Sequence, residues 1–202
     1  MDSYSILLLE ASRRETNMSF KLSKSKEGFI YFVTAKICGG KYIFLRPQYA
    51  SIILNSLKWL RENKKIRLYA FVIMPNHIHF LARALDNFTI LEICRCFESF
   101  TAHEILKLLV KEDKKYLIDF FKKEAEGLKD RVHKIWQDIQ AKECSREDFV
   151  LQKFKYIHNN PINKGWELVK DRMEYKYSSS IFYDSNFERK SIIEVDNLFD
   201  YL

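Results

Sequence analysis

Two histidines two residues apart are the first sign of chemistry in this sequence. His77 and His79 lie inside an apolar run, residues 74–81. Successive side chains of a β-strand point to opposite faces of the sheet, so these two project together if the run is a strand. Two imidazoles on one strand face are a partial metal site that needs further ligands.

A second group of polar residues follows much later in the chain, at 154–161. Tyr156 and Asn160 are four residues apart, and this spacing puts both side chains on one face of a helix. Pro161 ends that helix because it cannot continue the hydrogen-bond ladder. We therefore expect the strand face with the histidines and the helix face with Tyr156 to meet over one metal ion and a nucleic-acid phosphate.

Each of these signals also has an ordinary structural explanation. Most pairs of the His-x-His type are surface or hydrogen-bonded core histidines, and the Asn-Asn-Pro sequence that follows the helix can be helix-stop chemistry. Tyr156 can be a core aromatic residue, although its neighbours on the same face, Gln152 and Asn160, are amides. His158 is expected to be a solvated histidine at the helix end, within reach of a phosphate.

Two other chemistries that use paired histidines are excluded. Nucleotide hydrolases of the histidine-triad type need a third histidine at the next alternate position, which is occupied by Leu81. Metal-dependent amidohydrolases carry the pair on the first strand of a large barrel, and 202 residues are too few for that fold.

Composition limits the class of protein. The chain has 202 residues, of which 47% are hydrophobic, so it can form one well-cored domain with extensions. Its 34 basic and 27 acidic residues give a net charge of +7, which suits a polyanion partner but is common in proteins that bind none. The four cysteines fit no zinc spacing and no apolar run is long enough to span a membrane, so we expect a soluble cytoplasmic protein with reduced thiols.

Hydrophobic periodicity predicts strands and helices in alternation. The expected elements are a strand at 29–37, a helix at 47–63, a hairpin of strands at 68–74 and 77–84, a long helix from a capping box at 89–92, a strand at 135–141, and a helix from 145 to the proline at 161. This order favours an α+β fold, in which an antiparallel sheet of ferredoxin-like character carries helices mainly on one face.

Two segments resemble a known family. Residues 68–81 read LYAFVIMPNHIHFL and are similar to the HUH segment of single-tyrosine transposases. Residues 156–165 read YIHNNPINKG and resemble the catalytic-helix segment of the REP-associated tyrosine transposase branch. Smaller similarities at 100–101, 135–137 and 175–179 support the same register. The resemblance covers residues 28–183.

The resemblance implies a ferredoxin/RRM-like HUH fold and a metal-dependent endonuclease and transposase acting on single-stranded DNA. Such enzymes cleave and rejoin DNA through a 5′-phosphotyrosine intermediate. By position, His77 and His79 match the metal ligands, Tyr156 matches the nucleophile, and Asn160 matches the polar residue that completes the metal shell. The ion implied is Mg²⁺ or Mn²⁺.

The same resemblance divides the chain and gives its partners. It implies an N-terminal basic extension at 1–27, an HUH domain at 28–183 with a helical insertion at 111–134, and a C-terminal tail at 184–202. Single-stranded or hairpin DNA is the expected partner, the protein being a monomer or homodimer in the bacterial cytoplasm and nucleoid-associated when acting. The expected phosphate contacts are basic or helix-end residues: Lys64, Lys65, Arg67, His158 and Lys164.

Two other functions stay open at this point. A decayed relative on the same fold would bind single-stranded nucleic acid without cleaving it, and the presence of His77, His79, Tyr156 and Asn160 together argues against such decay. A metal-dependent phosphodiesterase of small molecules would have a closed pocket, and its activity would survive the loss of Tyr156.

Overall fold

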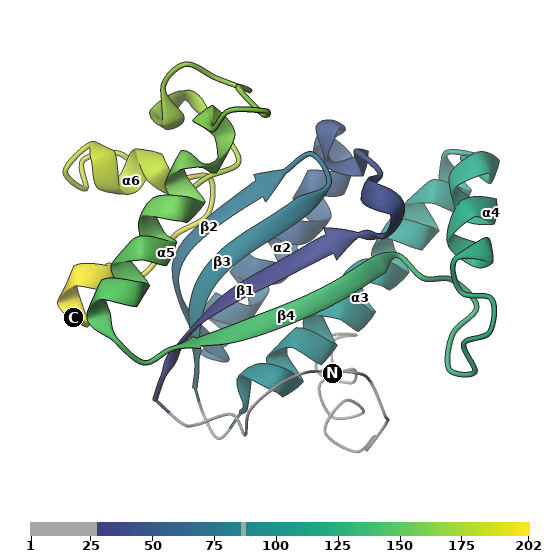
Figure 1. Cartoon of the computed structure of the whole chain (residues 1–202), viewed down its shortest axis with the longest axis horizontal. Coiled ribbons are helices and arrows are strands. Elements are labelled where there is room, and N and C mark those ends of the chain that lie inside the picture. The colour runs from purple at the N-terminus through teal and green to yellow at the C-terminus, as the bar shows by residue number, and fades with distance from the viewer. Residues whose placement is uncertain (1–27, 86–87) are drawn as a thin grey trace.

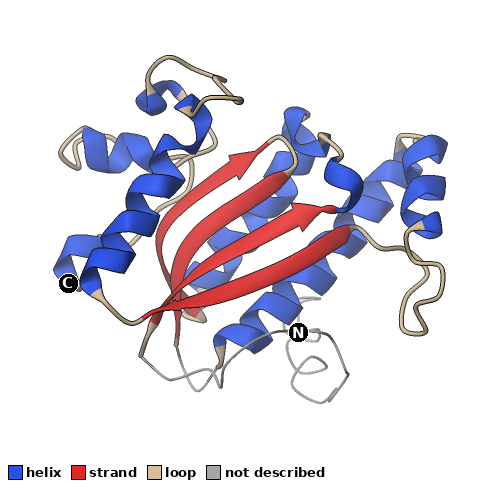
Figure 2. Cartoon of the chain, in the orientation of Figure 1, coloured by secondary structure: helices blue, strands red, loops and turns tan. Residues whose placement is uncertain are grey.

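A four-stranded antiparallel sheet forms the centre of the molecule (Figures 1 and 2). The computed structural model describes residues 28–85 and 88–202, so the expected N-terminal extension lies outside the described residues. The strand order is β2-β3-β1-β4. The strands are β1 (Ile30–Ile37), β2 (Ile66–Met74), β3 (His77–Ala84) and β4 (Trp136–Cys144).

The helices lie on both faces of this sheet. Helices α2 (Pro47–Glu62) and α3 (Ile90–Lys111) cover one face, and α5 (Glu147–Asn159) lies across the other (Figure 1). One aromatic contact on each face of the sheet illustrates this arrangement. Phe80 of β3 contacts Phe97 of α3 on one face, and Phe32 of β1 contacts Tyr156 of α5 on the other. The expected α+β architecture, with most helical cover on one face, is confirmed.

The apolar side chains of the sheet and of α2 make the core. Ile53, Leu57 and Leu60 repeat along one side of α2 and are fully buried, as are Val33 of β1 and Phe71 of β2. Burying an aliphatic or aromatic side chain of this size contributes roughly 1.5–3 kcal/mol relative to leaving it exposed. This rigid layer holds the strands whose other face carries the polar site.

The long helix α3 begins at the capping box that the sequence predicts. The Thr89 hydroxyl accepts a hydrogen bond from the Glu92 backbone N–H at 3.2 Å, and the Glu92 carboxylate accepts one from the Thr89 backbone N–H at 2.7 Å. Such a cap contributes about 1 kcal/mol to helix stability.

Among the described residues, no helix combines the length and apolar composition needed to cross a membrane.

The charged segment 111–134 contains the end of α3 and one further helix, α4 (Lys115–Lys123). Phe121 of α4 is fully buried, and its carbonyl accepts a hydrogen bond from the Lys134 N–H. This segment is thus packed against the rest of the molecule at the end of the sheet beside α3 (Figure 1). The last strand, β4, runs to Cys144 and is longer than the expected 135–141.

The C-terminal part of the chain covers the outer edge of β2. Backbone hydrogen bonds join Ile73 N–H to the Tyr177 carbonyl and Ser179 N–H to the Phe71 carbonyl. Further along, Asp196 N–H donates to the Leu68 carbonyl. These contacts pair an edge strand that would otherwise present free N–H and C=O groups. The tail at 184–202 therefore packs on its own domain.

Candidate active site at the paired histidines

The β2–β3 hairpin places both histidines on the sheet face that α5 covers. Met74 pairs with His77 across a tight turn at residues 75–76. Ile78 and Phe80 alternate with the histidines and are buried toward α3. The strand predicted at 77–84 has the predicted bounds. The two imidazoles accordingly face one way, with ring centroids 4.8 Å apart.

Asn76, in the turn, fixes the orientation of the His77 ring. The amide N–H of Asn76 donates to the Gly40 carbonyl at 3.2 Å, which turns its Oδ1 toward Nδ1 of His77 at 2.7 Å. An amide oxygen only accepts, so the proton of His77 lies on Nδ1 and the lone pair on Nε2. The Ile37 N–H also donates to the Asn76 carbonyl, which ties the turn to β1.

Two glycines make this contact possible. Gly39 and Gly40 have φ angles of 61° and 63°, in the left-handed region that side chains with a Cβ rarely adopt. A Cβ on Gly39 would lie 2.4 Å from Cζ of Phe120, so α4 packs directly on the turn. The Gly40 carbonyl is thereby presented to Asn76.

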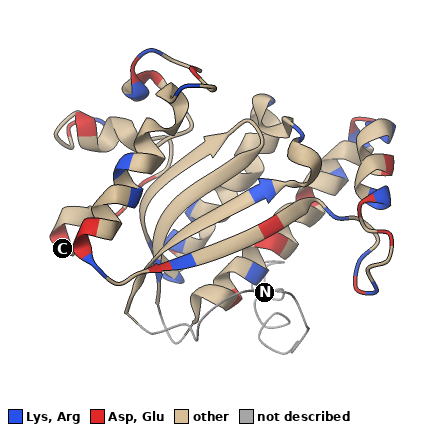
Figure 3. Cartoon of the chain, in the orientation of Figure 1, with Lys and Arg blue, Asp and Glu red and all other residues tan. Residues whose placement is uncertain are grey.

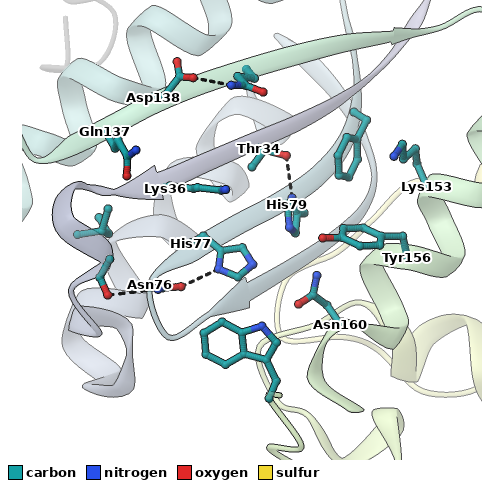
Figure 4. A pocket seen from close by; sticks show the side chains of 15 residues that line it. Thr34, Lys36, Asn76, His77, His79, Gln137, Asp138, Lys153, Tyr156 and Asn160 are labelled. Atoms are coloured by element: carbon teal, nitrogen blue, oxygen red, sulfur yellow. Dashed lines mark hydrogen bonds between the residues drawn. The ribbon is translucent and has the colours of Figure 1, made fainter. Parts of the chain in front are cut away.

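His79 is held by two neighbours from β1. Its Nδ1 lies 2.8 Å from the Thr34 hydroxyl, and its ring stacks on Phe32 with centroids 5.1 Å apart. Thr34 is the register partner of His79 in the β1–β3 pair, so the hydrogen bond follows from the sheet itself. With Nδ1 engaged, Nε2 is the nitrogen that remains for a ligand (Figure 4).

Both imidazoles are neutral at physiological pH. Burial lowers the pKa of His77 to about 4, with the Lys36 ammonium as a second cause. Burial lowers the pKa of His79 to about 3, and His77, Lys36 and Lys153 add to the effect. A metal ligand must be the neutral imidazole, so this environment keeps both side chains in the form that can coordinate.

Helix α5 brings Tyr156 and Asn160 to the same place. The Tyr156 ring lies 5.1 Å from the His79 ring and 5.9 Å from Phe32, and the side chain is 43% exposed. Asn160 is 3% exposed and lines the same pocket. Among the described residues, its side chain has no hydrogen-bond partner. The four residues singled out by the sequence are brought together (Figure 4).

These side chains line one pocket of about 650 Å³, the size of a site for a nucleotide-sized ligand. Lys36 comes from β1 and Lys153 from α5, where its ammonium lies 5.5 Å from the centre of the Tyr156 ring. One carboxylate, Asp138, also lines the pocket and accepts a hydrogen bond from Gln140 at 2.5 Å. The pocket thus offers positive charge beside the neutral imidazoles.

Comparison with known proteins finds one similar family and one similar solved structure. Residues 41–124, which include both histidines, match the family described as "Transposase IS200 like". The part of the chain that carries both histidines is thus similar to IS200-like transposases. A solved structure of the REP-associated tyrosine transposase bound to a REP hairpin matches with 17% identity and a TM-score of 0.60, covering 90% of this chain and 95% of that one. No curated protein matches.

The pocket offers few side chains that could bind a metal ion. No group of three His, Cys, Asp or Glu side chains that could hold a metal occurs in the described part of the chain. The candidate donors are the Nε2 atoms of His77 and His79 and the amide oxygen of Asn160. Two nitrogens and one oxygen around an open pocket fit a divalent cation that keeps positions for other ligands.

The basic residues expected to contact DNA do not gather at the pocket. Lys64, Lys65 and Arg67 lie at the start of β2, the opposite end from the hairpin, and Arg67 pairs with Asp196 at 3.3 Å. Lys164 is exposed in the loop after α5, nearer the pocket. Basic residues are spread over several elements (Figure 3). As DNA contacts these four remain predictions.

The expectation of a solvated His158 is wrong. Its side chain is 0% exposed, and its Nε2 lies 2.8 Å from the Ser179 hydroxyl. The rings of Phe154 and Tyr183 pack against it at 4.3 and 5.5 Å. His158 therefore belongs to the seam between α5 and the C-terminal segment, and it cannot contact a phosphate.

Sequence reasoning missed several residues of the site. Asn76 directly precedes the histidine pair, and Lys153 stands one helical turn before Tyr156, so spacing alone could have indicated both. Thr34 and Lys36 share a face of β1 by alternation, but only the β1–β3 register shows that they meet the histidines. Trp166 lines the pocket from a loop and has no periodic signal.

Proposed function

We propose that this protein is a metal-dependent single-strand DNA endonuclease and transposase that cleaves and rejoins strands through Tyr156. The observation that carries the proposal is the exposed Tyr156 ring beside His79, 5.1 Å away, in a pocket that also holds His77 and Asn160. A tyrosine kept exposed next to two neutral, oriented imidazoles has little structural reason to be there. The match of residues 41–124 to a transposase family supports the same conclusion.

His77, His79 and Asn160 would hold the ion, through two imidazole nitrogens and one amide oxygen. Mg²⁺ or Mn²⁺ bound there would polarise the scissile phosphate and take up developing negative charge. These three donors carry no charge, and the two ammonium groups of Lys36 and Lys153 outnumber the one carboxylate, Asp138, in the pocket lining. The phosphate of the DNA would add negative charge, so metal and DNA are expected to bind together.

The residues of the chain have separate tasks in strand cleavage. The phenol oxygen of Tyr156 forms a bond to phosphorus while the bond from phosphorus to the 3′ oxygen breaks. Tyr156 is exposed, so its proton can pass to water, and water can protonate the departing 3′ oxygen. Lys153 and Lys36 attract the phosphate, and Asn76 and Thr34 keep the imidazoles oriented. The reverse reaction rejoins strands without an external energy source.

Single-stranded or hairpin DNA is the proposed partner. The related solved structure is described as bound to a REP hairpin, and the pocket here has the positive charge and aromatic rings that suit exposed bases. The phosphodiester, being negatively charged, would meet Lys36 and Lys153 before it reached Tyr156.

The test is nicking of a labelled single-stranded oligonucleotide, selected for binding to the protein, in the presence of Mn²⁺. Wild-type protein should cut it, whereas Tyr156→Phe should bind it within a few-fold and leave it intact, because only one oxygen is lost. Persistent nicking by Tyr156→Phe would make water the nucleophile and overturn the proposal. Binding without nicking by the wild type would favour the non-catalytic alternative.

A further inference from the structure

Two further aromatic rings lie beyond His77, on the side away from Tyr156. The Trp166 ring centroid lies 5.6 Å from that of His77, and the Tyr42 centroid lies 5.9 Å from that of Trp166. Trp166 lines the pocket together with the histidines. Among the described residues, no ring contact joins Trp166 to Tyr156. The histidine pair therefore has Tyr156 at one end and the Trp166–Tyr42 pair at the other.

Neither ring is fully buried, although Trp166 packs against the edge of the core. Tyr42 is 58% exposed and Trp166 is half-buried. In the described part of the chain, neither the Tyr42 hydroxyl nor the Trp166 indole N–H has a hydrogen-bond partner. Tyr42 precedes a short 3₁₀ helix, Ile43–Leu45, and Trp166 comes from the loop after α5. Two distant segments therefore bring their rings together, tilted by 51° to each other, and Trp166 reaches the pocket.

The charges around the rings suit a nucleic-acid strand. Lys41 lies next to Tyr42, and its ammonium donates to the Tyr116 hydroxyl at 3.2 Å. Lys164, two residues before Trp166, is exposed, and Glu167 is the acidic neighbour on the other side. An aromatic pair beside an exposed basic residue and a polar pocket of nucleotide size suits the stacking of an unpaired base. A purely apolar ligand would not use the positive charge, and a small acidic ligand would not use the aromatic rings.

We propose that Tyr42 and Trp166 form a stacking platform for one unpaired nucleobase, next to the phosphate bound at the histidine pair. This inference rests on the proposed function, because the base belongs to the same DNA strand. Stacking uses the face that every base has, so the platform would hold a strand in place without reading its sequence. It would also place the adjoining phosphodiester between Trp166 and Tyr156.

Equilibrium binding to two polymers separates stacking from charge. The probes are a fluorescent twelve-residue oligothymidylate and an abasic polymer of the same length, which keeps the phosphates but lacks the bases. Trp166→Leu and Tyr42→Leu should each weaken oligothymidylate binding roughly five- to a hundred-fold. Neither should change the affinity for the abasic polymer. Trp166→Phe, which keeps an aromatic face, should retain most of the wild-type affinity.

The matched control is Phe187→Leu, which removes a ring that is 47% exposed and packs on Phe182 and Tyr183, away from Tyr42 and Trp166. It should leave both affinities unchanged. Equal losses for the two polymers, or no loss with either leucine variant, would overturn the platform. Because the assay needs neither metal nor cleavage, wild-type protein that binds in this way but never nicks DNA would refute the proposed function and leave the platform standing.

Discussion

The two sides of helix α5 hold imidazoles in opposite ways. On the pocket side, His77 and His79 have Nδ1 engaged by Asn76 and Thr34, and Nε2 remains for a ligand. On the buried side, the Nε2 of His158 is engaged by Ser179, and its Nδ1 is enclosed without a partner in the described part of the chain.

Burial lowers the pKa of all three histidines, so a lowered pKa does not by itself mark a functional site. What differs is access. The pocket pair faces an open cavity and an exposed tyrosine, whereas His158 faces Phe154 and Tyr183. We therefore propose that the pocket histidines take part in the chemistry and that His158 contributes to stability alone.

The largest expected effect comes from substituting the histidines of each region separately. His77→Ala combined with His79→Ala should abolish divalent-dependent nicking, while the protein still unfolds cooperatively. His158→Ala should instead lower the free energy of unfolding by about 2–4 kcal/mol, since it leaves a cavity in a packed seam. Urea unfolding and nicking, measured on both variants, test the assignment.

Two results would contradict the separate roles of the pocket histidines and His158. Nicking by the double variant at the wild-type rate would remove the pocket histidines from the chemistry. Loss of nicking in a folded His158→Gln variant would move His158 into the site. Ser179→Ala, which removes the hydroxyl partner of His158, is the matched control and should change stability alone.

A smaller effect is expected from Asn76, which acts on His77 without meeting the ion. Asn76→Ala frees the His77 ring to change tautomer and orientation, and loss of such a partner typically lowers metal affinity 10- to 100-fold. The Mn²⁺ concentration needed for half-maximal nicking should rise accordingly. Asn76→Asp keeps an acceptor for Nδ1–H and should restore most of the response; equal defects in both variants would contradict this role.

The smallest expected effect is on the pH dependence of stability. The pKa of His158 is lowered to about 3 by burial, with Arg172 as the second cause, whereas an unfolded histidine titrates near 6.5. As pH falls below about 6.5, the unfolded chain binds protons that the folded chain excludes, so the free energy of unfolding falls. His77 and His79 act in the same direction.

Each such histidine contributes a slope of up to about 1.4 kcal/mol per pH unit in that range. His158→Gln should therefore unfold with a shallower pH dependence than the wild type between about pH 6.5 and pH 4. Urea titrations at several pH values provide the measurement. An unchanged slope would mean that His158 is protonated in the folded state.

The sequence predicted the sheet and its polar pair better than it predicted the surroundings of α5. Alternation over 77–84 and the capping box at Thr89 are local signals, and both appear as expected. The helical stripe of Val150, Phe154 and Ile157 is also buried. His158 was mispredicted because the segment that buries it, around Ser179, lies along β2 through long-range backbone bonds that have no local pattern.

The contacts that orient the site histidines likewise depend on residues far apart in the chain. Asn76 reaches Gly40 because α4 and the glycine turn pack at the end of β1, and Thr34 meets His79 through strand register. Spacing along the chain carries no information on either contact. The residue types of a site can therefore be predicted from sequence, while the partners that set their tautomers require the tertiary structure.

We expect Tyr156 to become covalently linked to the 5′ phosphate of the cut strand. Wild-type protein and Mn²⁺ are incubated with one oligonucleotide labelled at either end. The 3′-labelled fragment should become attached to the protein, and the 5′-labelled fragment should be released with a 3′-hydroxyl. Mass spectrometry should place the adduct on the peptide containing Tyr156. Attachment of the 5′-labelled fragment, or an adduct on another residue, would contradict it.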